Sequence, residues 1–207
     1  MKIFKSPLLV STALVLCLTS CFSSAGSKNT VVYTPRASSP TASTNTAVPW
    51  QIRIDAPKSS DFLDSTHIAV RRANNTLQVF GGARWSDSVP DLLQNSLTQT
   101  FNDSGKINAV TGLDSNTISD AILLLDIRQF EAVYEQGDDS AAAVISVQAN
   151  IQLQKTNRII ASKHFLVSIP AQDKKIPQVM TAFDAALQQV SQDILNWTLT
   201  ADVPARK

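Results

Sequence analysis

The chain has 207 residues, of which 43% are hydrophobic and 17% are charged, and its formal net charge is +1 at pH 7. A chain of this length and composition can bury one sizeable hydrophobic core, as an ordinary globular protein does. The charge balance lacks the basic excess that neutralises phosphate groups, so it excludes nucleic acid as an expected partner.

The first 20 residues are arranged as a secretory signal. Lys2 and Lys5 provide a positive start, residues 8–18 are apolar, and Thr19 and Ser20 are small. The apolar run is shorter than the ~20 residues that a helix needs to cross a bilayer. We therefore expect residues 1–20 to be a signal peptide that is removed, rather than a retained membrane helix.

The residues at the end of this segment, Leu18-Thr19-Ser20-Cys21, resemble the lipobox of bacterial lipoproteins. The resemblance implies cleavage after Ser20 and a diacylglycerol attached to the sulfur of Cys21, and the sequence suggests no other cofactor. Two or three acyl chains hold a protein firmly at a membrane, whereas one binds only marginally. Two alternatives remain, a disulfide between Cys17 and Cys21 and an ordinary signal peptide that contains a chance cysteine.

Residues 21–47 are predicted to form the lipidated cysteine and a tether. From Phe22 to Ala47, 11 of 26 residues are Ser or Thr, and such a composition buries too little surface to offset the entropy of ordering. The exception is Val31-Val32-Tyr33, which predicts a short edge strand before Pro35.

The globular body is expected over residues 48–200, with a tail at 201–207. The body begins near Trp50, where the sequence WQIRIDAP alternates so that Ile52 and Ile54 share one face. This alternation is typical of a half-buried strand.

Two short strands follow before any helix. Residues 67–72 and 77–80 have the composition of strands, and the four residues between them form a plausible hairpin turn. Gly81-Gly82 after the second strand indicates a loop.

The first helix is signalled at both ends. Ser88 can cap it through the amide of Asp91, Pro90 fits its first turn, and Gly105 fits the C-terminal cap. Between these caps, apolar residues at helical spacing predict one face that packs on the rest of the protein: Val89, Leu92, Leu93, Leu97 and Phe101.

Four segments after this helix have the pattern of strands, namely residues 107–110, 121–134, 143–154 and 158–169. A short turn joins the last two, so antiparallel pairing is expected there.

A second helix is predicted from Lys175 to Thr198, with Pro177 in its opening turn. Its apolar stripe runs from Ile176 to Trp197, and Ser191 lies among the residues of the opposite, polar face. The order of the elements predicts an α+β fold in a single domain, with an antiparallel-rich mixed sheet and two helices packed on one face.

No catalytic or metal-binding residue is predicted, and we expect a protein that is not an enzyme. His67 and His164 each lie on a predicted strand without a Cys, a His or a carboxylate at ligand spacing. Asp126 and Arg128 share a strand face, where a solvated ion pair contributes ~0–1 kcal/mol, and Glu131 near them completes no recognisable site.

The segment GGARWSDSVPDLLQ, residues 81–94, has the densest local pattern of the body. Because Arg and Trp are enriched at interface hot spots, Arg84, Trp85 and Asp87 are candidate docking residues. The alternative is structural, with Trp85 filling the end of the sheet, residues 86–88 capping the helix and Arg84 reaching an acid.

The order of the motifs resembles a known family. The lipobox is followed by LDSTHIAVRRANNTLQVFGGARWSDSVPDLLQNSLTQTFNDSGKI, LLLDIRQFEAVY, IIASKHF and VMTAFDAALQQVSQDILNWTL, which lie within residues 50–199. These motifs closely resemble ABC-type transport auxiliary lipoproteins, which include paraquat-inducible protein C and the auxiliary lipoproteins of mammalian-cell-entry (Mce) transport systems. The family carries no catalytic signature. The long Ser/Thr-rich stretch before Trp50 departs from the family pattern and leaves the position of the first strand open.

The resemblance implies an outer-membrane lipoprotein that faces the periplasm and works beside a permease, an ATPase and an Mce-domain protein that move lipids or other hydrophobic molecules. Phe22, rather than Asp, follows Cys21, which agrees with outer-membrane sorting under the aspartate retention rule. The exposed sheet edge and the Arg84-Trp85 loop are the expected docking surfaces, and a homo-oligomer is compatible with the sequence. The alternative function is an envelope-assembly or secretion-scaffold lipoprotein that binds another periplasmic protein.

Overall fold

The computed structural model describes residues 30–35, 47–112, 118–135 and 140–204. These residues form eight strands and two helices. The strands are β1 (Val31–Tyr33), β2 (Val48–Ile54), β3 (His67–Arg71), β4 (Leu77–Trp85), β5 (Ile107–Thr111), β6 (Ala121–Tyr134), β7 (Ala141–Leu153) and β8 (Ile159–Pro170). The helices are α1 (Val89–Ser104) and α2 (Ile176–Thr198).

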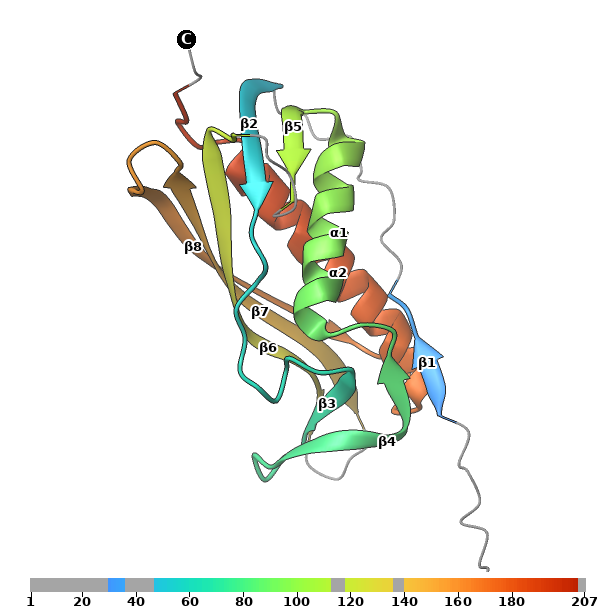
Figure 1. Cartoon of the computed structure of the whole chain (residues 1–207). Coiled ribbons are helices and arrows are strands. Elements are labelled where there is room, and N and C mark those ends of the chain that lie inside the picture. The colour runs from blue at the N-terminus through green and yellow to red at the C-terminus, as the bar shows by residue number, and fades with distance from the viewer. Residues whose placement is uncertain (1–29, 36–46, 113–117, 136–139, 205–207) are drawn as a thin grey trace, which may run out of the picture.

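Strand β6 is the centre of the sheet. β7 pairs with it antiparallel along nearly its whole length, and β8 pairs antiparallel with β7. The other edge of β6 holds two parallel strands end to end: β2 lies at its start, where Ile52 faces Ala121, and β3 lies at its end, where Ala69 faces Glu131. We call the end with β1, β3 and β4 the hairpin end, and the end with β2, β5 and the β7–β8 turn the far end (Figure 1).

The predicted α+β fold in a single domain is confirmed, and the antiparallel-rich sheet is confirmed only in part. The long ladders β6–β7 and β7–β8 are antiparallel, as is the β3–β4 hairpin. The other four pairings, β1–β4, β2–β5, β2–β6 and β3–β6, are parallel. The pairings of β2 and β3 with β6 are parallel because both strands run in the direction of β6. The β2–β5 pairing is parallel because helix α1 carries the chain back before β5 begins.

Gly81 and Gly82 lie inside β4, so the loop predicted from their composition is wrong. The β3–β4 register shifts between His67 and Ala69, which lie opposite this part of β4. Gly82 has a φ of +77°, a conformation that residues with a Cβ rarely adopt. The two glycines therefore mark a bulge within the strand rather than its end.

Helix α1 begins and ends at the predicted caps. The Ser88 Oγ accepts a hydrogen bond from the Asp91 amide at 3.5 Å and donates one to the Asp91 carboxylate at 2.8 Å. At the other end, Gly105 adopts a left-handed φ of 59°. Helix α2 follows Lys175 and carries Pro177 in its first turn, as predicted.

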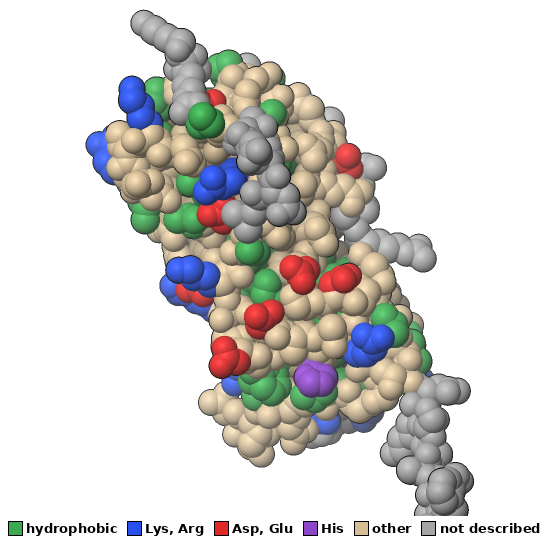
Figure 2. Space-filling model, in the orientation of Figure 1, with side chains coloured by type: hydrophobic (Ala, Val, Ile, Leu, Met, Phe, Trp, Pro, Cys, Tyr) green, Lys and Arg blue, Asp and Glu red, His purple; other side chains and the backbone are tan. Residues whose placement is uncertain are grey.

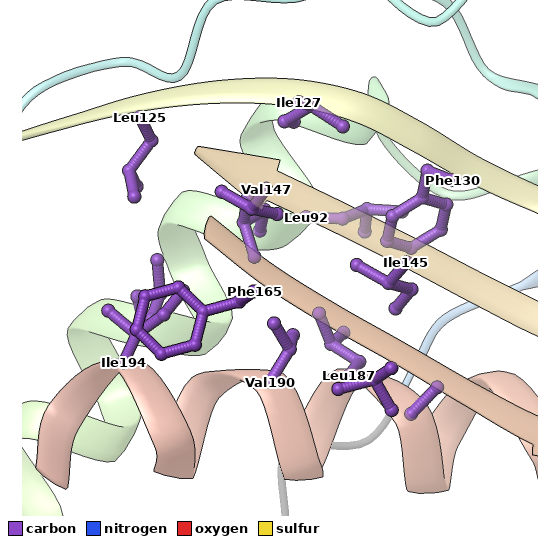
Figure 3. Packing of buried hydrophobic residues seen from close by; sticks show 14 of the residues in the cluster. Leu92, Leu125, Ile127, Phe130, Ile145, Val147, Phe165, Leu187, Val190 and Ile194 are labelled. Atoms are coloured by element: carbon purple, nitrogen blue, oxygen red, sulfur yellow. The ribbon is translucent and has the colours of Figure 1, made fainter. Parts of the chain in front are cut away.

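The two helices pack on one face of the sheet, as predicted. α2 lies against β7 and β8, and α1 packs beside it and against β2 and β5 (Figure 1). In the core between these layers, Ile145 of β7 and Phe165 of β8 lie on the side of α2 that carries Leu187, Val190 and Ile194 (Figure 3). All five side chains are buried, so the sheet and α2 share one hydrophobic core.

The polar face predicted for α2 is wrong at Ser191. Its side chain is fully buried, and its Oγ lies 3.0 Å from the Oγ of Ser96 on α1. Because α1 covers this side of α2, the two hydroxyl groups satisfy each other inside the core.

Strand β1 is the edge strand predicted within residues 21–47. It pairs in parallel with the end of β4, where Val31 lies opposite Ala83. Val31 and Val32 stay exposed, whereas Tyr33 packs against the core. The paired part of the fold therefore begins before residue 48.

Candidate functional site

Trp85 lies in the core and is not available to a partner, which corrects its prediction as a docking residue. Its side chain is 1% exposed and lies edge-on to Phe130 and Phe183, with ring centroids 5.7 and 5.1 Å away. Phe130 and Phe183 stack on each other at 5.3 Å. The three rings join β4, β6 and α2, so the indole has the structural role that the sequence also allowed.

Arg84 and Asp87 lie on either side of this buried ring and are both exposed. Arg84 is next to the last residue of β4, and strand alternation turns it outward where Trp85 turns inward. Asp87 directly precedes Ser88, the residue that caps α1. These two side chains can reach a partner, and their role in docking stays a prediction.

A buried ion pair lies where the sequence predicts no site. Glu131 is 2% exposed, and its carboxylate accepts hydrogen bonds from the Nε and Nη2 of Arg71 at 2.5 and 2.9 Å. The Nε2 of Gln129 donates a third at 3.0 Å. The hydrogen bond with Glu131 raises the pKa of Arg71 above its usual value. Only the parallel β3–β6 pairing brings these residues together, so no local sequence pattern could reveal the pair.

The surface ion pair predicted on β6 is present. The Nε of Arg128 lies 4.0 Å from a carboxylate oxygen of Asp126, and the two side chains are 52% and 54% exposed. At this distance and exposure the pair adds little stability. The result confirms that Asp126 and Arg128 form a solvated pair.

The two histidines lie on different strands. His67 is exposed at the start of β3, and the Nε2 of His164 on β8 lies 2.8 Å from the Oγ of Ser146 on β7. A serine beside a histidine acts as a nucleophile only if it can reach a substrate. Ser146 is 3% exposed, so this contact joins two strands as a cross-strand hydrogen bond.

An open pocket of about 380 Å³ lies at the start of β8, lined by Arg158, Ile159, Ile160, Ala161 and Asp202. Its lining includes one cation and one carboxylate but no pairing of a nucleophile with a base. Among the described residues, no three His, Cys, Asp or Glu side chains gather as metal ligands. On the face seen in Figure 2, acidic and basic side chains are interspersed.

The predicted lipidation site, Cys21, lies outside the described residues, as do the predicted signal peptide and most of the predicted tether. In the part of the chain that the structure describes, no helix combines the length and apolarity needed to cross a bilayer. The lipid anchor therefore stays a prediction.

The fold is shared with solved structures. The crystal structure of protein XCC0632 from Xanthomonas campestris, a DUF330 protein, is 34% identical in sequence with a TM-score of 0.76, over 82% of this chain and 95% of that one. An uncharacterized protein has a TM-score of 0.63 at 14% identity, over 82% and 99% of the two chains. The hypothetical protein CT253 from Chlamydia trachomatis has a TM-score of 0.51 at 6% identity, over 73% and 96%. At such low identity the last two show the fold alone.

Sequence comparisons identify the family. An uncharacterized protein of Bradyrhizobium diazoefficiens is 27% identical over 122 residues. The aligned region covers 59% of this chain but only 32% of that relative. The model of a family described as ABC-type transport auxiliary lipoprotein component matches residues 33–195, from β1 almost to the end of α2. Because this match covers well over half of the chain, the chain belongs to the family of ABC-type transport auxiliary lipoprotein components.

Proposed function

We propose that the chain is a non-enzymatic, periplasmic lipoprotein, anchored in the outer membrane, that serves as the auxiliary component of an ABC transporter of the Mce type. The transporter moves lipids or other hydrophobic molecules across the envelope. The observation that carries the proposal is the family match over residues 33–195. A role as an auxiliary component supports the view that neighbouring proteins supply the ATPase, the permease and the Mce domain.

The proposed anchor is a lipid on Cys21. The lipobox-like sequence before it supports this assignment, and Phe22 after it supports retention in the outer membrane rather than the inner one. Acyl chains hold the body at the membrane without a transmembrane helix.

The proposed docking residues are Arg84 and Asp87. Both are exposed, and they lie at the junction of β4 and α1. An exposed cation and an exposed anion three positions apart in the sequence favour a partner with complementary charges, and such complementarity sets specificity and association rate more than affinity. Trp85 supports this surface from inside the core, because it fixes the end of β4.

The test is crosslinking in intact cells, followed by affinity purification of the tagged full-length chain. We expect an Mce-domain protein, a permease and an ATPase to be recovered. Recovery should fall when Arg84→Glu is combined with Asp87→Lys. It should not fall when Arg128→Glu is combined with Asp126→Lys, a matched double charge reversal on the exposed face of β6. Recovery of peptidoglycan enzymes or secretion proteins without any Mce-domain protein would instead favour the envelope-scaffold alternative.

The non-enzymatic role has its own test in the two histidines. A variant that combines His67→Ala with His164→Ala should retain full transport-dependent growth, because neither imidazole is proposed to take part in chemistry. Immunoblotting of membrane fractions checks that the variant accumulates normally. Loss of growth at a normal protein level would contradict this part of the proposal.

A further inference from the structure

Strand β8 has a long side without a neighbouring strand. It pairs with β7 on one side, and no described strand pairs with its other side, which we call the open edge. Two other strands at the ends of the sheet, β1 and β5, are three and five residues long, whereas β8 has 12 residues. A long open edge presents unpaired backbone amides and carbonyls, which can pair with a strand of another molecule.

The middle of β8 lacks the backbone features that block such pairing. A bulge or a proline disturbs the backbone of an edge strand. In β8 the register shifts between Ile159 and Ala161, and the proline is the last residue, Pro170. Between these points, the register from Ala161 to Ile169 is regular. The side chain of Leu166 is 60% exposed and adds an apolar group to this stretch. Another feature must therefore keep the stretch from pairing.

Lys163 breaks the apolar pattern on the side of β8 that faces α2. Phe165 and Val167 lie on this side and are 5% and 7% exposed. Lys163 follows the same alternation and lies opposite the fully buried Ala149 of β7. Residues directly opposite each other in an antiparallel pair share a face of the sheet. A lysine thus occupies a position where strand alternation favours an apolar residue.

The Lys163 side chain is exposed, and its ammonium lies beside an aromatic pair. Its Nζ is 5.0 Å from the centre of the Phe165 ring, which lies edge-on to the ring of Trp197 on α2 at 5.6 Å. No carboxylate in the described part of the chain forms an ion pair with Lys163. No other Lys, Arg, Asp or Glu occurs in β8. Because β7 lies on one side of Lys163, the ammonium meets water at the open edge.

We propose that Lys163 keeps the open edge of β8 from pairing with a strand of a second copy of the chain. An added strand would lie about 4.8 Å from β8 and would cover the ammonium. Burying a charge without a partner is costly, so the lysine opposes strand addition while it leaves the fold intact. This inference goes beyond the proposed transport role and does not depend on the lipid anchor. It implies that partner proteins contact the chain without extending its sheet at β8.

The test compares variants of the full-length chain in detergent. Lys163→Val removes the charge and adds a strand-forming side chain, Lys163→Thr removes the charge with a smaller apolar change, and Lys163→Arg keeps the charge. Ser168→Val is the matched control, because it adds an exposed apolar side chain on the opposite face of β8 and keeps the lysine. Far-UV circular dichroism checks that each variant is folded.

Sedimentation measures the protein mass of each particle, and hydrogen exchange with mass spectrometry follows the amides of β8. In the wild-type chain about half of these amides point to the open edge and should exchange quickly. Particles of Lys163→Val and Lys163→Thr should hold about twice as many chains as wild-type particles, or more, with the β8 amides protected, because each copy pairs its edge with another. Lys163→Arg and Ser168→Val should behave as the wild-type chain does.

Three results would overturn the proposal. In the first, the two variants that lack the charge are folded and keep the wild-type particle size, or Ser168→Val assembles as they do. In the second, the β8 amides of the wild-type chain are already protected, which means that the edge is paired in the presence of the lysine. In the third, larger particles form but their β8 amides still exchange quickly, which assigns the assembly to another surface.

Discussion

Glu131 lies on the sheet and is only 2% exposed. Its carboxylate pairs with Arg71, which lies on a strand 60 residues earlier in the chain. The intact pair is held by two hydrogen bonds from the guanidinium, and Gln129 adds a third. Removing one partner of such a pair is far more costly than the pair itself is stabilising, because the remaining charge stays buried without compensation. Arg71 therefore matters for stability although its own side chain is 29% exposed.

Arg71→Ala is expected to lower the free energy of unfolding by about 3 kcal/mol, because it leaves Glu131 without its counter-charge. Arg128→Ala is the control, since it removes an exposed pair on β6, the strand that carries Glu131, and it should cost ~0–1 kcal/mol. Urea denaturation of the full-length chain in detergent, followed by far-UV circular dichroism, measures both. Similar decreases in the free energy of unfolding for the two variants would show that the Arg71–Glu131 pair stabilises the fold no more than an exposed pair does.

Trp85 allows the core and docking roles to be separated experimentally. Trp85→Ala removes a ring that contacts two phenylalanines and should cost about 3–5 kcal/mol. Trp85→Phe keeps an aromatic ring and should cost about 1–2 kcal/mol. Circular dichroism again measures stability, and crosslinking measures partner recovery. If the Trp85→Phe protein were folded and stable but no longer recovered its partner, the result would support a direct role of Trp85 in docking.

Residue identity predicted burial better than it predicted contacts. Trp85 is 1% exposed, which agrees with the structural alternative that its sequence context allowed and not with docking. The partners of Trp85, and the pairing of Arg71 with Glu131, depend on strands brought together from distant parts of the sequence. Composition alone favours both an interface and a core for tryptophan, so only the fold could decide between them.

At the scale of the element, the helix caps were predictable because they are local. Ser88, Asp91 and Gly105 act within one turn of the ends of α1, and each has the predicted role. The hydrophobic spacing of α2 likewise predicted its buried face, except at Ser191, where α1 adds a second packing surface. A single-helix pattern carries no information on a second helix that packs beside it.

Gly105→Ala tests the left-handed cap of α1. A Cβ at this position meets nothing within 4 Å, so the cost comes from the φ of 59° and should be about 1 kcal/mol. Gly112→Ala is the control, because a Cβ there also meets nothing within 4 Å and its φ is not positive, and the change should be within about 0.5 kcal/mol of zero. Thermal and urea denaturation measure the free energy of unfolding of both variants. Equal decreases for the two variants would contradict the role of the left-handed conformation of Gly105.

The direction of the strands was the part of the fold that the sequence could not supply. Alternation along β2 shows which side chains face the core but is the same for parallel and antiparallel neighbours. The glycine pair in β4 has the composition of a loop, yet a bulge uses the same residues. The β7–β8 pairing was predicted correctly because a short turn between adjacent strands leaves an antiparallel hairpin as the expected arrangement.

At the scale of the whole molecule, the family could be predicted from the sequence, and the anchor at Cys21 stays a proposal. The family match spans residues 33–195, which include most of the motifs that suggested it, although the lipobox precedes this range and the last motif continues to Leu199. The lipobox suggests an anchor at Cys21 but does not say which end of the body lies beside it.

Phe22→Asp tests the proposed sorting. The aspartate after the lipidated cysteine is the retention signal for the inner membrane in bacteria that use this rule, so the variant should move from the outer-membrane to the inner-membrane fraction. Density-gradient separation of the membranes, with immunoblotting of the tagged chain, measures the shift. Phe22→Ser is the control and should stay in the outer membrane. A Phe22→Asp protein that remained with the outer membrane would contradict the proposed localisation.

The central position of β6 also bears on how the chain folds. Contacts of β2 and β3 with β6 and the residue just before it join positions 69 and 60 apart, as in Gln51 with Asp120 and Arg71 with Glu131. Such long-range pairings close large loops before they gain any stabilisation, so folding is expected on the slower, millisecond-to-second scale. The first four strands cannot complete their sheet until β6 has followed them. If the chain is exported as we propose, β2 and β3 would pair with β6 only after all of β6 has crossed the membrane.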